Sequence, residues 1–429
     1  MKDVFKMIIR GFQTQIPKKD VCRRDLKIPI DTNKIIALTG TRRCGKTFYF
    51  FALINQLLET GIKPEQILYI NFEDERLDLK SKDLQSILDA YFELYPEIQN
   101  EDIFFFFDEI QEVENWEKFI ARIYSSVSKK IFITGSTSKM ISSEIATQLR
   151  GRSLSYTLYP LSLNEYCRFM DISPKDIYSP RNRAIIKSAF DNYLFAGGYP
   201  ETVKFEPEIQ RKILQSYFDV MIFRDIVERY NVRNPIVLKH FIKQLMNTVS
   251  AEFSIHKIYQ NLKSNGFQTS KDKLYSYLDY GRDCFLFFVV HQNEKSYRKQ
   301  QKNKKKIYAV DNGLLSTVNY TFSQDKGRQL ENLIFLHLIR KYEHVFYYHN
   351  GFECDFLIKE NEQVSIIVQV CFDISDTQTR KREIDALLKL SEIYPDSDLI
   401  LLNIEEDVEV MIDKKRIQII PAWKWCLEI

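Results

Sequence analysis

The fold of the first part of the chain is decided by Ile35-Ile36-Ala37-Leu38-Thr39-Gly40-Thr41-Arg42-Arg43-Cys44-Gly45-Lys46-Thr47. The first five of these residues form a short apolar run, which is typical of a strand covered on both faces in a parallel sheet. A stretch with helical apolar spacing, 48–58, follows the quoted residues. Between strand and helix stands G-x-x-x-x-G-K-T, whose glycines let successive backbone N–H groups point at phosphate oxygens. The sequence therefore predicts a phosphate-binding loop.

Two side chains of this loop have predicted roles. Lys46 is expected to reach the β- and γ-phosphates of a nucleotide, and the Thr47 hydroxyl is expected to bind Mg²⁺. An ordinary glycine-containing turn is the alternative, which the flanking strand and helix disfavour. The predicted nucleotide-binding residues of this region are Gly40, Thr41, Arg42, Arg43, Cys44, Gly45, Lys46, Thr47 and Phe48.

Further runs of the same kind occur at 67–72, 103–107 and 131–134, separated by helical patterns such as 116–126. Strands that alternate with helices predict a doubly wound α/β parallel sheet.

A pair of acids follows the apolar run 103–107. Asp108 stands 62 positions after Lys46 (108 − 46), which leaves room for the intervening helix, strand and second helix. Asp108 is expected to hold the magnesium ion, and Glu109 to polarise the attacking water. The alternative is a strand that ends in solvated acids.

Hydroxyl and guanidinium groups lie near the next strand ends. The run 131–134 ends in Gly135-Ser136-Thr137-Ser138, at the edge where open α/β sheets bind ligands, and one of these hydroxyls could orient the water. Arg150 and Arg152 precede the strand-like run 154–158, and an arginine there could contact a γ-phosphate. A solvated arginine at a helix end is the alternative.

These motifs together resemble the AAA+ (AAA_14-type) ATPases fused to a DUF4143 domain, over nearly the whole chain. The residues that carry the resemblance are Gly40–Thr47, Asp108-Glu109, Thr134-Gly135-Ser136, Gly151-Arg152 and Leu158–Ser162. The resemblance implies an AAA+ core, a helical lid, a winged-helix-like segment and a restriction-endonuclease-like α/β module.

The resemblance also implies roles for single residues. Ser136 matches the sensor position and Arg152 the arginine-finger position, with Ser138 and Arg150 as neighbouring alternatives. Gly198-Tyr199-Pro200 is similar to the lid motif of signal-transduction ATPases, in which the proline contacts adenine. A helix-breaking turn is the alternative reading of that motif.

The expected organisation has five parts. They are a leader at 1–30, the AAA+ core at 31–161, the helical lid at 162–232, the winged-helix-like segment at 233–320 and a degenerate nuclease-like module at 321–429, with the DUF4143 region at about 220–429.

A basic stretch joins the strand-like runs 284–291 and 306–310. Its cations are Lys295, Arg298, Lys299, Lys302, Lys304, Lys305 and Lys306. In a winged helix such a loop lies along the phosphate backbone, so duplex DNA is a predicted partner. The alternative is a solvated, mobile loop.

The C-terminal module carries acids where a metal-dependent nuclease of that fold would carry them. These residues are Glu331, which precedes the predicted hairpin turn Asn350-Gly351, and Asp355 and Gln369-Val370-Cys371, which follow it. The expected lysine is replaced by Cys371, and a thiol supplies no cation at neutral pH. We therefore expect the module to bind a partner or to dimerise, and not to cleave nucleic acid. Its acidic side chains are expected to be held by hydrogen bonds and not by a metal ion. Asp355 could equally be an acid at a sheet edge.

Composition limits the remaining choices. The 429 residues carry 61 Lys+Arg against 58 Asp+Glu, so charge alone indicates neither nucleic acid nor membrane. The seven scattered cysteines argue against a disulfide framework, and no apolar run approaches the roughly 20 residues of a membrane span. We expect a cytoplasmic protein of two to four domains, without a membrane partner.

The sequence predicts a Mg²⁺-dependent protein that binds and hydrolyses ATP and couples turnover to movement of its C-terminal modules, with a homo-oligomer or a protein as a further partner. The alternative is a nucleotide-gated switch, or a DNA- or protein-binding protein, with little turnover. A small-molecule kinase is disfavoured by the Asp108-Glu109 pair and by the absence of an obvious acceptor-site insertion.

Overall fold

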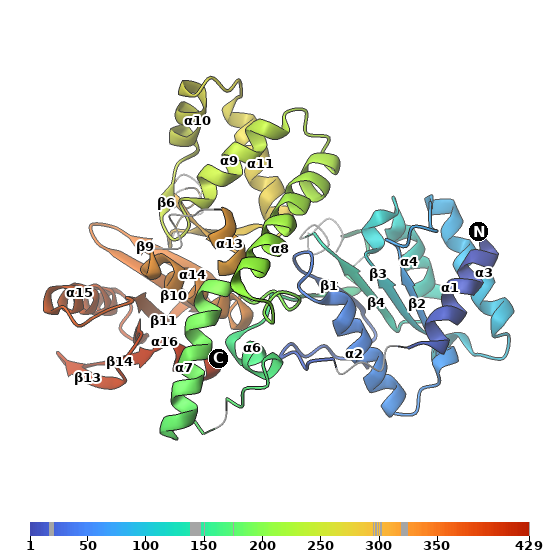
Figure 1. The fold of residues 1–429 in the computed structure, drawn as a ribbon, viewed down its shortest axis with the longest axis horizontal. Helices are drawn as coiled ribbons and strands as arrows, with labels where there is room; N and C mark the ends of the chain where they lie inside the picture. The colour runs from blue at the N-terminus through green and yellow to red at the C-terminus, as the bar shows by residue number, and fades with distance from the viewer. Residues whose placement is uncertain are drawn as a thin grey trace. The chain divides into compact units, whose positions relative to one another are not determined.

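A computed structural model describes residues 1–429 except 17–20, 138–146, 150, 175, 295, 297, 299, 301–302, 319–324 and 429 (Figure 1). The chain divides into two compact units, Met1–Tyr159 and Pro160–Ile429. None of the helices in the described part of the chain has the length and apolar composition that crossing a bilayer would take. All seven cysteines are free thiols.

The first unit contains a five-stranded sheet in the order β2-β3-β4-β1-β5, in which every neighbouring pair is parallel. Its strands are β1 (Ile35–Thr39), β2 (Ile67–Asn71), β3 (Phe104–Asp108), β4 (Ile131–Gly135) and β5 (Ser153–Thr157). Because parallel strands end at the same edge, the segments after β1, β3 and β4 meet there. The predicted doubly wound parallel sheet is confirmed.

Helices cover both faces of this sheet, as Figure 1 shows. They are α1 (Lys2–Thr14), α2 (Lys46–Glu59), α3 (Gln85–Leu94) and α4 (Trp116–Ser126), with short helical turns η1 (Pro64–Gln66), η2 (Ser81–Leu84), η3 (Asn100–Asp102) and η4 (Ile110–Glu112). Successive residues of a strand point to opposite faces. Phe105 and Phe107 of β3 therefore pack with α3 and α4, and Phe104 and Phe106 pack with α2.

Helix α1 lies in the segment that the sequence suggested to be a leader. It buries Phe5, Ile8 and Ile9 in the same core as α3, because these residues share one helical face. Part of the predicted leader therefore belongs to the first unit.

The second unit begins with helices and a small antiparallel sheet. The helices are α6 (Leu163–Phe169), α7 (Pro180–Ala196), α8 (Pro207–Val220), the π-helix η6 (Met221–Glu228), α9 (Pro235–Met246), α10 (Ile255–Ser264), α11 (Lys271–Asp283) and α13 (Asn312–Val318). The sheet has the order β6-β8-β7, with β6 (Glu252–Phe253), β7 (Phe287–His291) and β8 (Lys305–Ala309). Three helices and an antiparallel ribbon follow one another here, which is the order that the sequence predicts.

A six-stranded mixed sheet completes the second unit, in the order β13-β14-β12-β11-β10-β9. Its strands are β9 (Val345–His349), β10 (Glu353–Glu360), β11 (Gln363–Val370), β12 (Asp398–Asn403), β13 (Val408–Ile412) and β14 (Lys415–Pro421), and its helices are α14 (Lys326–Lys341), α15 (Thr377–Ile393) and α16 (Ala422–Glu428). One face packs with α14 and α16 and the other with α15. Gly351 turns the predicted β9–β10 hairpin at a φ of 77°.

Candidate nucleotide-binding site

The loop between β1 and α2 has a backbone that requires glycine. Gly40 and Gly45 adopt φ angles of 150° and 100°, and a Cβ atom on Gly40 would lie 2.1 Å from the Leu158 carbonyl oxygen. Helix α2 begins directly after the loop, at Lys46, so the N–H groups of its first turn face the loop. The loop thus has the geometry of an anion site at a helix N-terminus.

Lys46 is buried behind this loop. Its ammonium donates to the carbonyl oxygens of Gly40 at 3.1 Å and Thr41 at 3.3 Å, and it pairs with Glu109 Oε1 at 3.1 Å. Burial alone would lower the pKa of Lys46, but the charge of Glu109 reverses this and leaves the pKa raised. The ammonium is therefore charged and held by groups that a phosphate could replace.

Asp108 ends β3 and accepts hydrogen bonds from three hydroxyl groups. Thr47 and Tyr69 donate to Oδ2 at 2.7 Å and 3.0 Å, and Thr134 donates to Oδ1. Burial and the neighbouring charge of Glu109 raise the pKa of Asp108, which the three donors partly offset. The Asp108 carboxylate and the Thr47 hydroxyl therefore lie together at the end of the sheet, as two oxygen ligands of the kind that Mg²⁺ prefers.

Glu109 follows in a left-handed conformation, with φ 53°. Its backbone N–H donates to Thr134 Oγ1 at 2.8 Å, and its carboxylate pairs with Lys46 and accepts from Gln111 Nε2 at 2.6 Å. Burial would raise the pKa of Glu109, but Lys46 and Gln111 leave it lowered. The carboxylate is thus ionised at neutral pH, as a general base must be.

The other loop residues lie around this centre. Arg42 pairs with Glu73 at 2.8 Å, Arg43 is exposed at a φ of 68°, and burial raises the pKa of the Cys44 thiol. Phe48 is exposed on α2, next to Phe51.

The predicted sensor and finger have local contacts in the first unit. Ser136 is buried after β4, and its Oγ lies 3.5 Å from Gln111 Nε2. Arg152 donates to Ser125 Oγ at 2.9 Å and lies over the Tyr124 ring. The alternatives Ser138 and Arg150 lie outside the described residues.

Pro200 belongs to the second unit. It follows the turn that ends α7, where Gly197 has a φ of 77° and the Gly198 N–H donates to Asp311 at 2.7 Å. The helix break is confirmed, and the contact of Pro200 with adenine stays a prediction.

Sequence reasoning missed two residues of the first site, Tyr69 and Gln111. Tyr69 brings a hydroxyl into the apolar strand β2, and Gln111 stands two positions after Glu109. Both signals are visible in the sequence, but neither indicates its partner. The partners become evident only when β2, β3 and β4 lie side by side.

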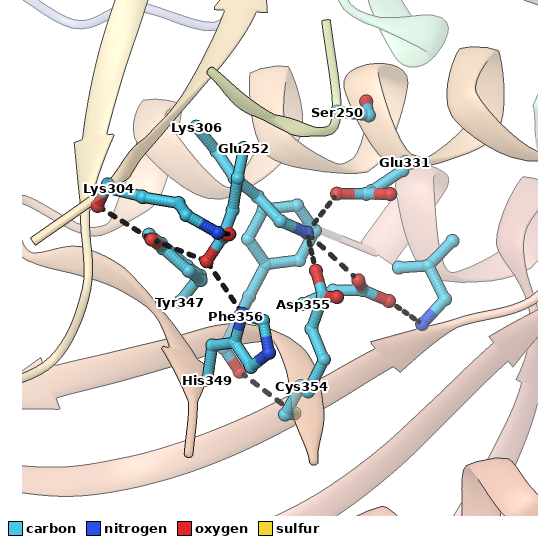
Figure 2. Close-up of polar contacts among 12 residues, drawn as sticks. Ser250, Glu252, Lys304, Lys306, Glu331, Tyr347, His349, Cys354, Asp355 and Phe356 are labelled. Atoms are coloured by element: carbon cyan, nitrogen blue, oxygen red, sulfur yellow. Dashed lines mark hydrogen bonds and ion pairs between the residues drawn. The ribbon is translucent and has the colours of Figure 1, made fainter. Parts of the chain in front are cut away.

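A second polar cluster surrounds Lys306 of β8 and corrects two expectations (Figure 2). The Lys306 side chain is 1% exposed, and its ammonium lies 3.0 Å from Glu331, 2.7 Å from Glu353 and 3.4 Å from Asp355. Lys306 was expected to contact DNA phosphate from the basic loop, and this expectation is wrong because its side chain points inward from β8. The C-terminal acids were also expected to lack a cation, which Lys306 supplies.

The other cations of the basic loop differ in exposure and in ion pairing. Lys304 pairs with Glu252 at 2.8 Å, Lys305 is half-buried and Arg298 is exposed. Lys295, Lys299 and Lys302 lie outside the described residues. The loop therefore offers fewer free cations for phosphate than its sequence suggests.

Asp355 and Gln369 lie together on β10 and β11, as expected. Asp355 accepts from the Val370 N–H at 3.0 Å, and its own N–H donates to Gln369 Oε1 at 3.3 Å. Burial and the charge of Glu331 raise the pKa of Asp355 to about 8. Burial raises the pKa of the Cys371 thiol to about 11, so the thiol is neutral at neutral pH. Within the part of the chain that the structure describes, no three His, Cys, Asp or Glu side chains are arranged to hold a metal ion.

Comparisons with known families agree with the first unit and correct the second. Residues 32–167 match a family model described as an AAA domain (AAA_14). Residues 187–325 match a model described as a domain of unknown function, DUF8612. The expected AAA+ core is confirmed, whereas the expected DUF4143 partner is not.

Among solved structures, the ORC1 protein of Aeropyrum pernix in complex with DNA covers 76% of this chain and 92% of its own, with 11% identity and a TM-score of 0.32. A TM-score of this size supports no conclusion about this chain.

Two relatives are similar in sequence to most of this chain. The Uncharacterized protein MJ1544 of Methanocaldococcus jannaschii is 36% identical, over 99% of this chain and 96% of its own. An uncharacterized protein of Haemophilus influenzae is 30% identical, over 85% of this chain and 88% of its own. The chain therefore belongs to one protein family with the MJ1544 protein, and its residues 32–167 form an AAA domain of the P-loop NTPase fold.

Proposed function

We propose that the chain is a Mg²⁺-dependent ATPase. The observation that supports this most is the convergence of Lys46, Thr47, Asp108 and Glu109 behind a glycine loop in an AAA domain. An ammonium, two oxygen ligands and an ionised carboxylate are the groups that phosphoryl transfer to water needs.

The described residues fit a nucleotide and a magnesium ion. The Gly40 backbone leaves no room for a side chain, and the α2 N-terminus faces the loop, which is the arrangement by which backbone N–H groups bind phosphate. Thr47 Oγ1 and Asp108 Oδ2 would hold the metal, directly or through its water shell. When bound, the ion would neutralise phosphate charge and orient the γ-phosphate.

Lys46 is the group that must change partners. It would leave Glu109 and the two carbonyl oxygens for the phosphates, because the several negative charges of the β- and γ-phosphates attract the ammonium more strongly than one carboxylate does. Glu109 would then be free to accept a proton from water at its Oε1. Ser136 is proposed to orient this water, and Arg152 to contact the γ-phosphate of a neighbouring copy.

A switch with little turnover is the second candidate. The Lys46–Glu109 ion pair favours it, because a base that is paired with a cation is a weaker base. In that case bound ATP would hold one conformation, and hydrolysis would be incidental.

Turnover measurements separate the two candidates. We expect multiple turnovers of ATP, lost when Mg²⁺ is omitted, for the full chain with and without duplex DNA. One ATP retained per chain without further product would favour the switch.

The second unit is proposed to bind partners, including duplex DNA, and to move with the nucleotide cycle. The three helices and the β7–β8 ribbon support a winged-helix-like interpretation, and Arg298 is an exposed cation beside the ribbon. Salt-dependent binding of duplex, weakened in Arg298→Ala, tests this part.

We also propose that this unit does not cut DNA, since the described residues hold the Glu331 and Asp355 carboxylates against Lys306. Cleavage of plasmid in Mg²⁺ or Mn²⁺ that disappears in Asp355→Ala would contradict this.

A further inference from the structure

We propose that Gln111 is a positioning residue for hydrolysis, which holds the Glu109 carboxylate and presents an acceptor to the attacking water. This inference rests on the ATPase activity proposed above. It assigns a role to a side chain that belongs to neither the phosphate loop nor the acidic pair.

The backbone after β3 places Gln111 next to Glu109. The turn η4 carries Gln111 at its centre, and the Glu112 N–H donates to the Glu109 carbonyl oxygen at 3.2 Å. Ile110, beside Gln111, is buried in the core of the sheet and anchors the turn. Gln111 is therefore held by the fold and not by a mobile loop.

The Gln111 amide connects two strand ends. Its Nε2 donates to Glu109 Oε2 at 2.6 Å and lies 3.5 Å from Ser136 Oγ, which follows β4. The first distance is that of a strong hydrogen bond to a charged group, and the second is at the outer limit of one. Gln111 thus fixes the base relative to the predicted sensor.

The other end of the amide has no partner. Gln111 Oε1 is buried and accepts no hydrogen bond from the described residues. A buried acceptor without a donor is unfavourable, so the site is suited to a molecule that brings an O–H group. Because Oε1 and Nε2 share one carbon atom, a water that donates to this oxygen would be held close to the group that contacts the Glu109 carboxylate.

During the hydrolysis cycle, one carboxylate oxygen of Glu109 would lose its partner and the other would keep it. Oε1 pairs with Lys46, and Oε2 is held by Gln111. When Lys46 turns to the phosphates, Oε1 is released while Oε2 stays in place. Gln111 would therefore keep the base oriented at the moment when its other partner leaves.

In the proposed step the attacking water gives up one proton and bonds to the γ-phosphorus. One O–H of the water donates to Gln111 Oε1, and the other transfers its proton to Glu109 Oε1. The water oxygen bonds to the γ-phosphorus while the bond from that phosphorus to the bridging oxygen breaks, and ADP leaves with that electron pair. Gln111 itself gains and loses no atom.

The split between rate and affinity gives a readout that a purely structural role would not produce. The described contacts of the Gln111 amide are with Glu109, the proposed base, and with Ser136. Loss of the amide should therefore slow the chemical step while ATP affinity is kept.

The test compares Gln111→Met with the wild-type chain, with Glu109→Gln and with Gln85→Met. Methionine has a similar length but neither donates nor accepts strongly. Gln85 lies exposed on α3, where its Nε2 donates to Asp89, so Gln85→Met is the matched control for the substitution itself. The measurements are single-turnover hydrolysis at neutral pH, ATP affinity and melting temperature.

We expect Gln111→Met to hydrolyse ATP about tenfold more slowly or worse, with its ATP affinity within about twofold of wild type. If Gln111→Met melts much earlier than the wild type, Gln111→Asn is used instead. It keeps a neutral amide but is one methylene shorter, so the amide no longer reaches Glu109 Oε2, and the same loss of rate is expected.

If the wild type does not turn over, the proposed ATPase is overturned and this inference with it. If the wild type turns over and Glu109→Gln is as fast, the assignment of Glu109 as the base is overturned, together with the role of Gln111. If Glu109→Gln is inactive while Gln111→Met matches Gln85→Met in rate, only the role of Gln111 is overturned.

Discussion

Lys46 in the first unit and Lys306 in the second are both buried against carboxylates, but they are held differently. Lys46 pairs with Glu109 and donates to two carbonyl oxygens of a glycine loop. Lys306 pairs with three carboxylates that come from β10 and from α14, and it lies near the Tyr347 ring.

The difference shows what makes a buried cation exchangeable. Phosphate can replace the partners of Lys46, because carbonyl oxygens are weak acceptors and Glu109 remains paired with Gln111. Displacing Lys306 would instead leave the buried Glu331 without the cation that it pairs with. The first lysine is suited to a reaction, and the second is suited to holding β8 against the six-stranded sheet.

The largest effect is expected from removing Lys46, the lysine whose partners we regard as exchangeable. Lys46→Ala should lower ATP affinity about 100-fold or more, because Lys46 meets phosphate charge in the bound state. Glu109→Gln should keep affinity and slow the single-turnover rate by about 100-fold or more. Isothermal titration and quenched-flow assays measure the two effects. Hydrolysis by Glu109→Gln at the parent rate would show that the acidic pair has been assigned wrongly.

Removing the other lysine should affect stability and not nucleotide binding. Lys306→Met should destabilise the second unit by about 3–5 kcal/mol, because it removes the cation that pairs with the buried Glu331. Lys304→Met is the matched control, since Lys304 also pairs with a glutamate but is exposed, and it should change little. Denaturant unfolding of both variants decides the matter. Equal stability of the two would mean that Lys306 is no more firmly held than a surface lysine.

The surroundings of Lys306 should also make the stability of the folded chain depend on pH. The pKa of Asp355 is raised to about 8 by burial and by Glu331, so the folded chain holds this proton more tightly than the unfolded chain, where the pKa is about 4. Its contribution is present at low pH and is lost as pH rises toward 8. Asp355→Asn should therefore flatten the fall in melting temperature between pH 5 and 8. An unchanged slope would argue against a raised pKa at this position.

The smallest expected effect concerns Asp108. Tyr69→Phe removes one of its three hydroxyl donors but keeps the ring that stacks on Phe12, 4.5 Å away. We expect the Mg²⁺ concentration for half-maximal hydrolysis to rise severalfold, with a loss of about 1 kcal/mol of stability. A Mg²⁺ titration of the ATPase rate measures this. The same half-maximal concentration in both proteins would show that Thr47 and Thr134 suffice to hold the carboxylate.

The sequence by itself determined the parts that depend on near neighbours in the chain. Strand runs, helical spacing and the glycine loop at 40–47 are encoded within about ten residues, as is the Asn350-Gly351 turn. The parallel sheet and the convergence of Lys46 with Asp108-Glu109 followed from these patterns, because parallel strands end at one edge.

Only the tertiary structure decided which distant side chains meet. Tyr69 contacts Asp108 from 39 positions away, Gln111 lies near Ser136 from 25 positions away, and Lys306 meets Asp355 from 49 positions away. A local pattern predicts that a lysine lies at the start of a strand, but not which face of the sheet its side chain takes. Lys306 is therefore a loop cation in the sequence and a buried counter-ion in the fold, because register and burial are set by strand pairing over long distances.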